Sequence, residues 1–342
     1  TRPTEATRRA IAGAEVGDDV YGEDPTVLEL ERETALLLGK PAALFVPSGT
    51  MGNEIAIVVH GRPGREVVLD SQSHIMTAEG GGPAVLAGVT LRPLASDTGR
   101  LDPDRVASAL VLDDDPHHAP TVLACAENTH NRLGGRVFPP DVFTELAALL
   151  GRHQIPLHLD GARLWNAAVA SGLSAAELAG PADSVMVCFS KGLGAPVGSA
   201  LAGSEAFIHE ARRVRKLLGG GMRQAGILAA GCRFALEHHR ERLSEDHRRA
   251  RRLAELVPLP VGAAILGGRP ETNIVIWDLP PDRFDVFEIR RRLAADDIHL
   301  SDFGPGRLRA VTHLDVDDAG IERVAASLAD LLAEAGTRVV YR

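Results

Sequence analysis

The sequence predicts an α/β protein, with a large domain built on an open, mainly parallel sheet and a smaller C-terminal α+β domain. Short apolar stretches alternate with helical patterns through most of the chain, an order typical of parallel sheets covered by helices. Many of these stretches end in polar residues, as strands do at the edge of such a sheet where ligands bind. From about residue 258 the pattern shortens to strand–helix–strand–helix. We therefore expect domains at residues 1–245 and 246–342.

Length and composition limit the class of protein. The 342 residues, of which 45% are hydrophobic and 24% charged, are enough for a large core. A net charge of −9 argues against general nucleic-acid binding. The chain shows no run of 18 apolar residues and no basic-then-apolar leader, so neither a membrane span nor a signal peptide is predicted. Three cysteines without CxxC spacing indicate a reduced compartment, and we expect a cytoplasmic protein.

The individual elements follow from the spacing of apolar residues. Helices repeat them every three or four positions, and buried strands are short apolar runs bounded by turn residues. In the large domain we expect strands over 42–46, 67–69, 85–91, 121–126, 157–159 and 185–189. We expect helices there over 5–14, 26–38, 53–59, 141–150, 164–171, 205–218 and 222–239. Further on, we expect a charged, solvated linking helix over 240–256, strands over 273–277 and 308–311, and helices over 284–294 and 319–335.

The predicted strand over 185–189 ends at Ser190-Lys191-Gly192. The chain has only three lysines against 34 arginines, so a lysine at this position is unusual for it. A lysine just past a buried strand has a flexible stem and a pKa that shifts on desolvation, as a Schiff-base lysine requires. The alternative is a lysine at a strand end that simply reaches solvent.

Two other strand ends carry groups that complement such a lysine. Ser48-Gly49-Thr50 lies between a strand and a helix, where free N–H groups and two hydroxyls suit an anion, although the segment could be an ordinary N-cap. Asp160 lies 31 residues before Lys191, at the end of what we expect to be a neighbouring strand. Pyridoxal phosphate needs an aspartate facing its ring nitrogen, and the flat ring of His74 could stack on it. Arginines near the site would hold a substrate carboxylate.

Six segments of the chain carry a family resemblance: DDVYGEDPTVLELE, PSGTMGN, ENTHN, DGARLWNA, FSKGLGAPVGS and GGGMRQAGILAA. Together they resemble the L-threonine aldolase family of fold type I pyridoxal-phosphate enzymes, in its low-specificity form. The resemblance implies a fold like that of the pyridoxal-phosphate-dependent transferases. It also implies that L-threonine, L-allo-threonine and related β-hydroxy-α-amino acids are cleaved to glycine and an aldehyde.

The resemblance also implies roles for individual residues. Lys191 would form the Schiff base and Asp160 would face the ring nitrogen, while Ser48, Gly49 and Thr50 would bind the phosphate. His74 would stack on the ring, and His130 would lie near the substrate hydroxyl. Arg163 and Arg309 would contact the substrate carboxylate or the cofactor's phenolic oxygen. Arg223 would reach the phosphate of a neighbouring subunit. A homo-oligomer follows, either a dimer or a tetramer, with active sites at the subunit interface.

Several alternatives stay open at this point. His74 and His130 could be loop histidines, Arg309 could be an ordinary strand arginine, and the base could be either histidine or a water. No metal site is expected, because His117-His118 beside Asp113-Asp114-Asp115 is typical of a solvated turn. The rival activities are β-elimination and transamination with the same cofactor. A protein that binds the cofactor without turnover is a further possibility.

Overall fold

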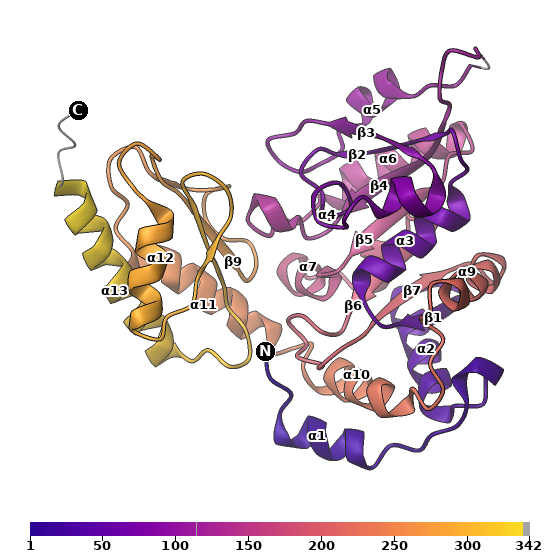
Figure 1. Ribbon diagram of the computed structural model, residues 1–342, viewed down its shortest axis with the longest axis horizontal. Helices are drawn as coiled ribbons and strands as arrows, with labels where there is room; N and C mark the ends of the chain where they lie inside the picture. The colour runs from indigo at the N-terminus through magenta and orange to yellow at the C-terminus, as the bar shows by residue number, and fades with distance from the viewer. Residues whose placement is uncertain (114, 338–342) are drawn as a thin grey trace.

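A seven-stranded sheet lies at the centre of the larger part of the molecule (Figure 1). The computed structural model describes residues 1–113 and 115–337. The strand order is β1-β7-β6-β5-β4-β2-β3; β2 to β6 run parallel, and β7 is antiparallel to both β6 and β1. The strands are β1 (Ala42–Val46), β2 (Glu66–Asp70), β3 (Thr90–Leu94), β4 (Thr121–Glu127), β5 (Leu157–Gly161), β6 (Ser184–Cys188) and β7 (Ser199–Gly203).

The direction of β1 explains how distant segments meet. Because β1 and β6 are both antiparallel to β7, they run the same way. The carboxyl ends of β1, β2, β4, β5 and β6 therefore lie on one edge of the sheet. Asp160 lies at the end of β5, and the segments after the other four strands carry Ser48, His74, His130 and Lys191, which is the arrangement that the sequence predicts.

Helices cover both faces of this sheet. Apolar side chains on one face pack under α3 (Gly49–His60), α4 (His74–Thr77) and α9 (Glu205–Leu217). The other face packs under α2 (Pro25–Leu38), α5 (Pro103–Ala109), α6 (Pro140–Arg152), α7 (Leu164–Ser171), α8 (Ala175–Ala179) and α10 (Gly226–His238). Outside these layers, α1 (Glu5–Ala12) packs on α10, and short helical turns lie at η1 (Asp19–Tyr21), η2 (Pro83–Ala87) and η3 (Asn131–Leu133). None of the helices in the described ranges has the length and apolarity to cross a bilayer.

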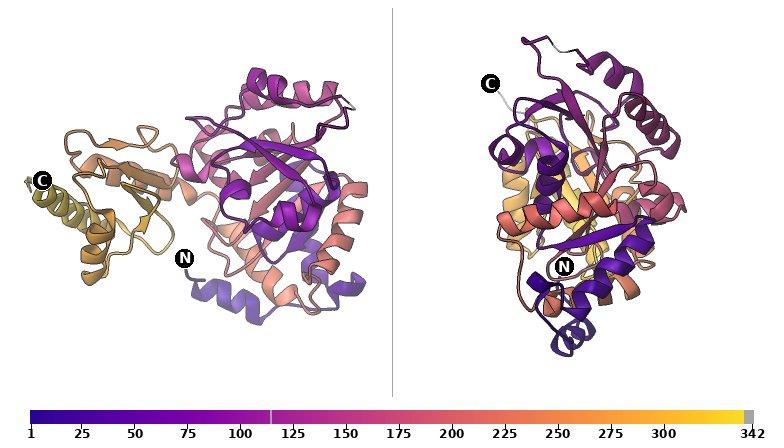
Figure 2. Two further views of the ribbon diagram at one scale, coloured as in Figure 1. Left: turned by 45° about the horizontal axis from the view of Figure 1, so that its top comes forward. Right: turned by 90° about the vertical axis from the view of Figure 1, so that its right-hand side faces the viewer.

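A second, antiparallel sheet has a core of its own, drawn in orange and yellow in Figure 1 and in the left view of Figure 2. Its strand order is β10-β11-β9-β8. The elements are β8 (Ala264–Ile265), β9 (Ile274–Asp278), α12 (Val286–Ala295), β10 (Ser301–Asp302), β11 (Arg307–Val311) and α13 (Asp318–Thr337). The domain boundary between residues 245 and 246 stays a prediction, and residues 338–342 of the smaller domain lie outside the described residues.

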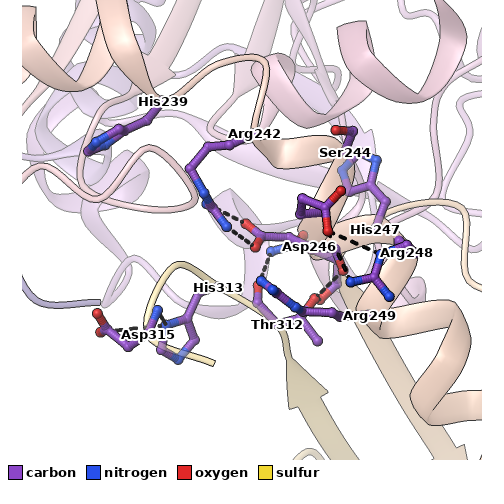
Figure 3. Close-up of polar contacts among 12 residues, drawn as sticks. His239, Arg242, Ser244, Asp246, His247, Arg248, Arg249, Thr312, His313 and Asp315 are labelled. Atoms are coloured by element: carbon purple, nitrogen blue, oxygen red, sulfur yellow. Dashed lines mark hydrogen bonds and ion pairs between the residues drawn. The ribbon is translucent and has the colours of Figure 1, made fainter. Parts of the chain in front are cut away.

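The helix α11 (Leu243–Leu256) joins the two cores. A helix was expected here, but the expectation that it is solvated is wrong for one of its faces. Leu243 packs in the core of the larger part and Leu253 in that of the smaller part. The buried Asp246 forms an ion pair with Arg242 (Figure 3), at a distance of 2.6 Å. Thr312 Oγ1 donates to the backbone carbonyl of Asp246 at 2.6 Å. The charged residues on the other face of α11 account for the solvated character of the segment.

The strand expected over 85–91 is displaced. Residues Pro83–Ala87 form a helical turn that ends at Gly88, whose φ is 65°, and β3 begins only at Thr90. Val85 is 80% exposed rather than buried. A short apolar run does not by itself distinguish a strand from a helical turn, and the glycine decides between them here.

The start of α10 also differs from the prediction. The helix begins at Gly226, not at Met222. The carboxylate of Asp24 accepts from the Gly226 N–H at 2.8 Å. Residues 222–225 precede the helix, and the Arg223 carbonyl accepts from the Asp19 N–H at 2.9 Å. Arg223 thus lies in an irregular segment beside the loop before α2.

Candidate active site

One pocket at the carboxyl edge of the large sheet gathers six of the predicted site residues. It has a volume of about 360 Å³ and is lined from the turn after β1, from α3, α4, β5 and β6, and from the loop after β6. The six are Ser48, Gly49, Thr50, His74, Asp160 and Lys191. The other four predicted residues, His130, Arg163, Arg223 and Arg309, are not part of its lining.

A larger cavity of about 570 Å³ lies in the smaller part of the molecule, next to α13. Its histidines already have partners: His299 Nε2 lies 3.2 Å from an Asp297 carboxylate oxygen and His313 Nδ1 lies 3.7 Å from one of Asp315. It contains no lysine. The chemistry that the sequence predicts therefore belongs to the smaller pocket.

Lys191 lies in the loop after β6, three residues beyond its last residue Cys188, and is half-buried. Its Nζ contacts Cys188 Sγ at 3.5 Å. Among the described residues no carboxylate lies within 4.0 Å of this ammonium group. A lysine held in a pocket by a thiol alone is free to react with a carbonyl compound.

The Asp160 carboxylate is held from two sides. This side chain is 2% exposed at the end of β5. Oδ1 accepts from the Ala162 N–H at 3.0 Å, and Oδ2 accepts from Asn53 Nδ2 at 3.0 Å. Asn53, on α3, is part of the quoted PSGTMGN segment, but no sequence pattern singles it out. These two donors fix the carboxylate so that its remaining lone pairs face the pocket that it lines.

A chain of buried hydrogen bonds fixes Asn53 in turn. Its Oδ1 lies 3.1 Å from His158 Nε2, and His158 Nδ1 lies 2.9 Å from Ser184 Oγ. Burial lowers the pKa of His158 to about 3, so this histidine is neutral. Because Asn53 Nδ2 points at carboxylates, its Oδ1 must accept, and His158 carries its proton on Nε2.

The segment Ser48-Gly49-Thr50 is the start of α3. Ser48 is the N-cap, and its Oγ accepts from the Met51 N–H at 3.2 Å. A Cβ on Gly49 would lie 2.8 Å from Cys188 Sγ, so only glycine lets the helix start approach β6 this closely. The first N–H groups of a helix have no intrahelical acceptor, and those of α3 border the pocket. The two interpretations of this segment, N-cap and anion site, are therefore compatible.

His74 lies across the pocket at the start of α4. Its Nδ1 is 2.9 Å from Glu79 Oε1, and its backbone N–H donates to Glu127 Oε2 at 2.8 Å. The hydrogen bond with Glu79 raises the pKa of His74. The side chains of His74, Glu79 and Asp160 converge, since one polar atom from each lies within 4.8 Å of the others.

His130 is placed differently from His74. It is 2% exposed, with Nε2 at 3.1 Å from Asp70 Oδ1 and 3.9 Å from Glu127 Oε2. Its Nδ1 is buried and makes no hydrogen bond to the described residues. Burial lowers the pKa of His130, but the carboxylates of Glu127 and Asp70 outweigh it and raise that pKa overall.

Two of the three predicted arginines, Arg163 and Arg309, belong to a cluster of cations. Arg309 Nη2 donates to Asn131 Oδ1 at 2.7 Å, while its buried Nε has no acceptor among the described residues. Arg309 and Arg132 both lie over the Phe303 ring, at 4.7 and 4.8 Å from its centre. Burial and the neighbouring guanidinium groups of Arg163 and Arg132 lower the pKa of Arg309 to about 9. The cluster therefore favours an anion, and Arg132 is a member that the sequence did not reveal.

Arg223 lies apart from these groups. Its guanidinium is exposed and forms an ion pair with Asp18 at 2.6 Å, over the ring of Tyr21 at 5.5 Å. It does not line the pocket of its own chain. The segment around His117 and His118 is exposed, as expected for a solvated turn, and these histidines pair with Asp115 and Asp113. Asp114 lies outside the described residues.

Comparison with known proteins identifies the family of this chain. The beta-eliminating lyase family model matches residues 1–279. A probable low-specificity L-threonine aldolase 2 of Arabidopsis thaliana is 43% identical over 332 residues, covering 95% of this chain and 92% of the plant protein. The low specificity L-threonine aldolase of Escherichia coli (strain K12) is 40% identical over 334 residues, covering 97% of each chain.

Among solved structures, the Leishmania major threonine aldolase superposes with a TM-score of 0.83, at 22% identity and over 97% of each chain. The fold that the sequence predicts is thereby confirmed. The family resemblance is confirmed by the family model and by the close relatives. The chain belongs to the beta-eliminating lyase family, and within it to the low-specificity L-threonine aldolases.

Proposed function

We propose that this protein is a pyridoxal-phosphate-dependent threonine aldolase. It cleaves L-threonine, L-allo-threonine and related β-hydroxy-α-amino acids to glycine and an aldehyde, and is thus a carbon–carbon lyase. The observation that best supports this is that Lys191, Asp160 and the start of α3 border one pocket. The sequence and family comparisons point to the same reaction.

The residues of the pocket fit pyridoxal phosphate. The Lys191 side chain has a thiol as its neighbour and no carboxylate partner among the described residues, which leaves its amine available to the cofactor's aldehyde. The start of α3 offers unpaired N–H groups for a phosphate, and the absence of a Cβ at Gly49 lets this helix start lie against Cys188 at the pocket. When bound, this cofactor withdraws electrons from the carbon that carries the substrate amine. A volume of about 360 Å³ is in the range of small-molecule sites.

Asp160 would keep the ring nitrogen protonated. Its carboxylate is fixed by the Ala162 N–H and by Asn53, and neutral His158 holds Asn53 in that orientation. Such preorganised charge is among the largest contributions to catalysis. Arg309, together with Arg163, would hold the substrate carboxylate and so orient the bond that breaks, because the buried Arg309 Nε still lacks an acceptor.

His74 is the better placed of the two histidines to take the proton of the β-hydroxyl group. It lines the pocket, whereas His130 does not. Its Nδ1 is engaged by Glu79, so Nε2 is the nitrogen left for the substrate. The pKa of a histidine is close enough to neutrality for this transfer, and a water positioned by His74 is an equivalent route.

The active assembly is proposed to be a dimer or a pair of dimers. Among the described residues, Lys191 and His74 are the basic side chains that line the pocket, and a phosphate calls for a further cation. Arg223, exposed and outside the lining of its own pocket, would supply it to a neighbouring subunit, which in closed symmetry makes the contact reciprocal. The cytoplasmic location stays a prediction.

Product analysis tests the proposed reaction. The purified protein with added pyridoxal phosphate is incubated with L-threonine, L-allo-threonine and phenylserine. The proposal predicts equal amounts of glycine and aldehyde. Ammonia with 2-oxobutanoate from threonine would instead indicate β-elimination, the activity for which the family is named, and a hydroxy keto acid formed only with an added amino-group acceptor would indicate transamination. Bound cofactor without any product would indicate a protein that binds the cofactor without turnover.

A further inference from the structure

Two buried carboxyl groups lie behind the pocket. Glu54, on α3, is 3% exposed and Glu79, just after α4, is 7% exposed. Both oxygens of Glu54 and Oε2 of Glu79 are buried and have no hydrogen-bond donor among the described residues. Three such acceptors without a donor are unfavourable when both groups are ionised.

The two groups act on each other directly. Burial, followed by the charge of Glu79 and a hydrogen bond with it, raises the pKa of Glu54 to about 8. The chain also closes tightly over Glu54, since a Cβ on Gly82 would overlap its carboxyl group. The glycine at position 82 thus lets the backbone approach closely enough to keep water and other donors away from this carboxyl group.

The remaining oxygen of Glu79 shows which group is ionised. Glu79 Oε1 accepts from Asn53 Nδ2 at 2.8 Å and lies 2.9 Å from His74 Nδ1. Because Asn53 donates to this oxygen and His74 Nδ1 can donate to it as well, the ionised form of Glu79 is favoured. The proton is therefore on Glu54, whose own oxygens face no other donor.

We propose that Glu54 and Glu79 share one proton, with the Glu54 carboxylic acid donating to Glu79 Oε2, and that this pair is a positioning unit for His74. Two like charges in one buried site are resolved in this way, because one proton removes the repulsion and supplies the missing donor. The neighbouring titratable groups are His74 on α4, Cys125 on β4, Asp160 on β5 and Lys191 after β6.

The consequence concerns the tautomer of His74 and rests on the proposed function. A fixed Glu79 carboxylate holds the His74 proton on Nδ1 and leaves Nε2 as an acceptor toward the pocket. The same carboxylate orients Asn53, which donates to Asp160. One shared proton thereby fixes the tautomer of His74, the proposed base, and the orientation of Asn53 toward Asp160, the group proposed to face the cofactor ring. Ionisation of Glu54 at alkaline pH would disturb both.

Infrared spectroscopy of the holoenzyme tests the shared proton without reference to turnover. At neutral pH the wild-type protein should show the carbonyl stretch of a buried carboxylic acid, and the band should fade as the pH rises through about 8. Glu54→Gln should lack the band. Glu66→Gln is the matched control, because Glu66 is equally buried but bonded to Arg92 and Thr121, and the band should persist in it. No such band in the wild type, or an unchanged band in Glu54→Gln, would overturn the proposal.

Kinetics test the positioning role. The side-chain amide of the Glu54→Gln variant can donate to Glu79 as the acid does, so this variant should stay active at neutral pH and lose the alkaline decline in kcat that begins near pH 8. Glu79→Gln should lower kcat by up to about 10²-fold, which is the lower end of the range for a lost proton-transfer group, and should change KM less. Glu79→Asp should recover part of the lost kcat. An identical pH profile in wild type and Glu54→Gln would refute the role. A protein with the infrared band but no aldolase activity would instead refute the proposed function alone.

Discussion

Replacing Arg309 should weaken substrate binding in a way that can be worked from its contacts. In the free protein one of its donors is used by Asn131 at 2.7 Å, and the buried Nε–H has no acceptor among the residues that the structure describes. A substrate carboxylate would satisfy this donor and relieve the repulsion from Arg163 and Arg132 that, together with burial, lowers the pKa of Arg309. Binding therefore gains one charge-assisted hydrogen bond that the free enzyme lacks.

Loss of a hydrogen bond between charged groups costs about 1.5–3 kcal/mol, which corresponds to a roughly 10- to 150-fold change in affinity. We expect KM for L-threonine to rise by that factor in Arg309→Ala. In Arg309→Lys the rise should be about tenfold, because the charge stays but the planar fork is lost. Steady-state assays of aldehyde release measure both.

Arg307→Ala is the matched control for this change. Arg307 lies two residues earlier on β11 and is paired with Asp278 at 3.6 Å, and it is not one of the guanidinium groups that lower the pKa of Arg309. The KM of the Arg307→Ala variant for L-threonine should equal that of the wild type. An unchanged KM in Arg309→Ala, or an equal rise in both variants, would show that Arg309 does not bind the substrate carboxylate.

The remaining residues give three further predictions. Asp160→Asn should retain cofactor but lose several kcal/mol of transition-state stabilisation, about the size of the largest electrostatic contributions; kcat near wild type in this variant would refute the role of Asp160. His74→Phe should lower kcat by roughly 10²–10⁴-fold, and His130→Phe should have the smaller effect because His130 is buried outside the pocket lining; the reverse order would make His130 the base. Lys191→Ala and Arg223→Ala chains should each be weak or inactive alone and recover activity when unfolded and reassembled together, because each hybrid dimer holds one complete site; hybrids without activity would show that Arg223 serves no neighbouring site.

The part of the site that the sequence predicts is the part that follows strand ends. Lys191 and Asp160 each come directly after a buried apolar run, and the helix start at Gly49 is marked by its cap. These signals are local, so they are readable without a structure. The parallel sheet then brings them together, because its strands share one carboxyl edge.

The part that the sequence did not reveal depends on contacts between distant segments. Asn53, Glu54 and Glu79 follow no pattern that separates them from other polar residues of helices and loops, and their role emerges only when α3 and α4 are placed side by side. Arg132 joins Arg309 only because both lie over Phe303.

Two predictions about the fold are wrong for similar reasons. The strand β7, with the sequence SALAG, was missed because small residues carry little signal of a buried strand. It is nevertheless the antiparallel strand that separates β1 from β6. Helix α11 was expected to be solvated because its sequence is rich in arginine, yet Leu243 and Leu253 are enough to bury one of its faces.

The central claim is that Lys191 carries the cofactor. Borohydride reduction of the protein with pyridoxal phosphate, followed by peptide mapping, tests it directly, because the chain has only three lysines. Lys40 Nζ is bound to the carbonyl groups of Gly180 and Ala182, and Lys216 lies on α9 outside the pocket lining. We predict one reduced pyridoxyl group per chain, on Lys191, and none in Lys191→Ala. A label on Lys40 or Lys216, or a stoichiometric label that persists in Lys191→Ala, would contradict the account.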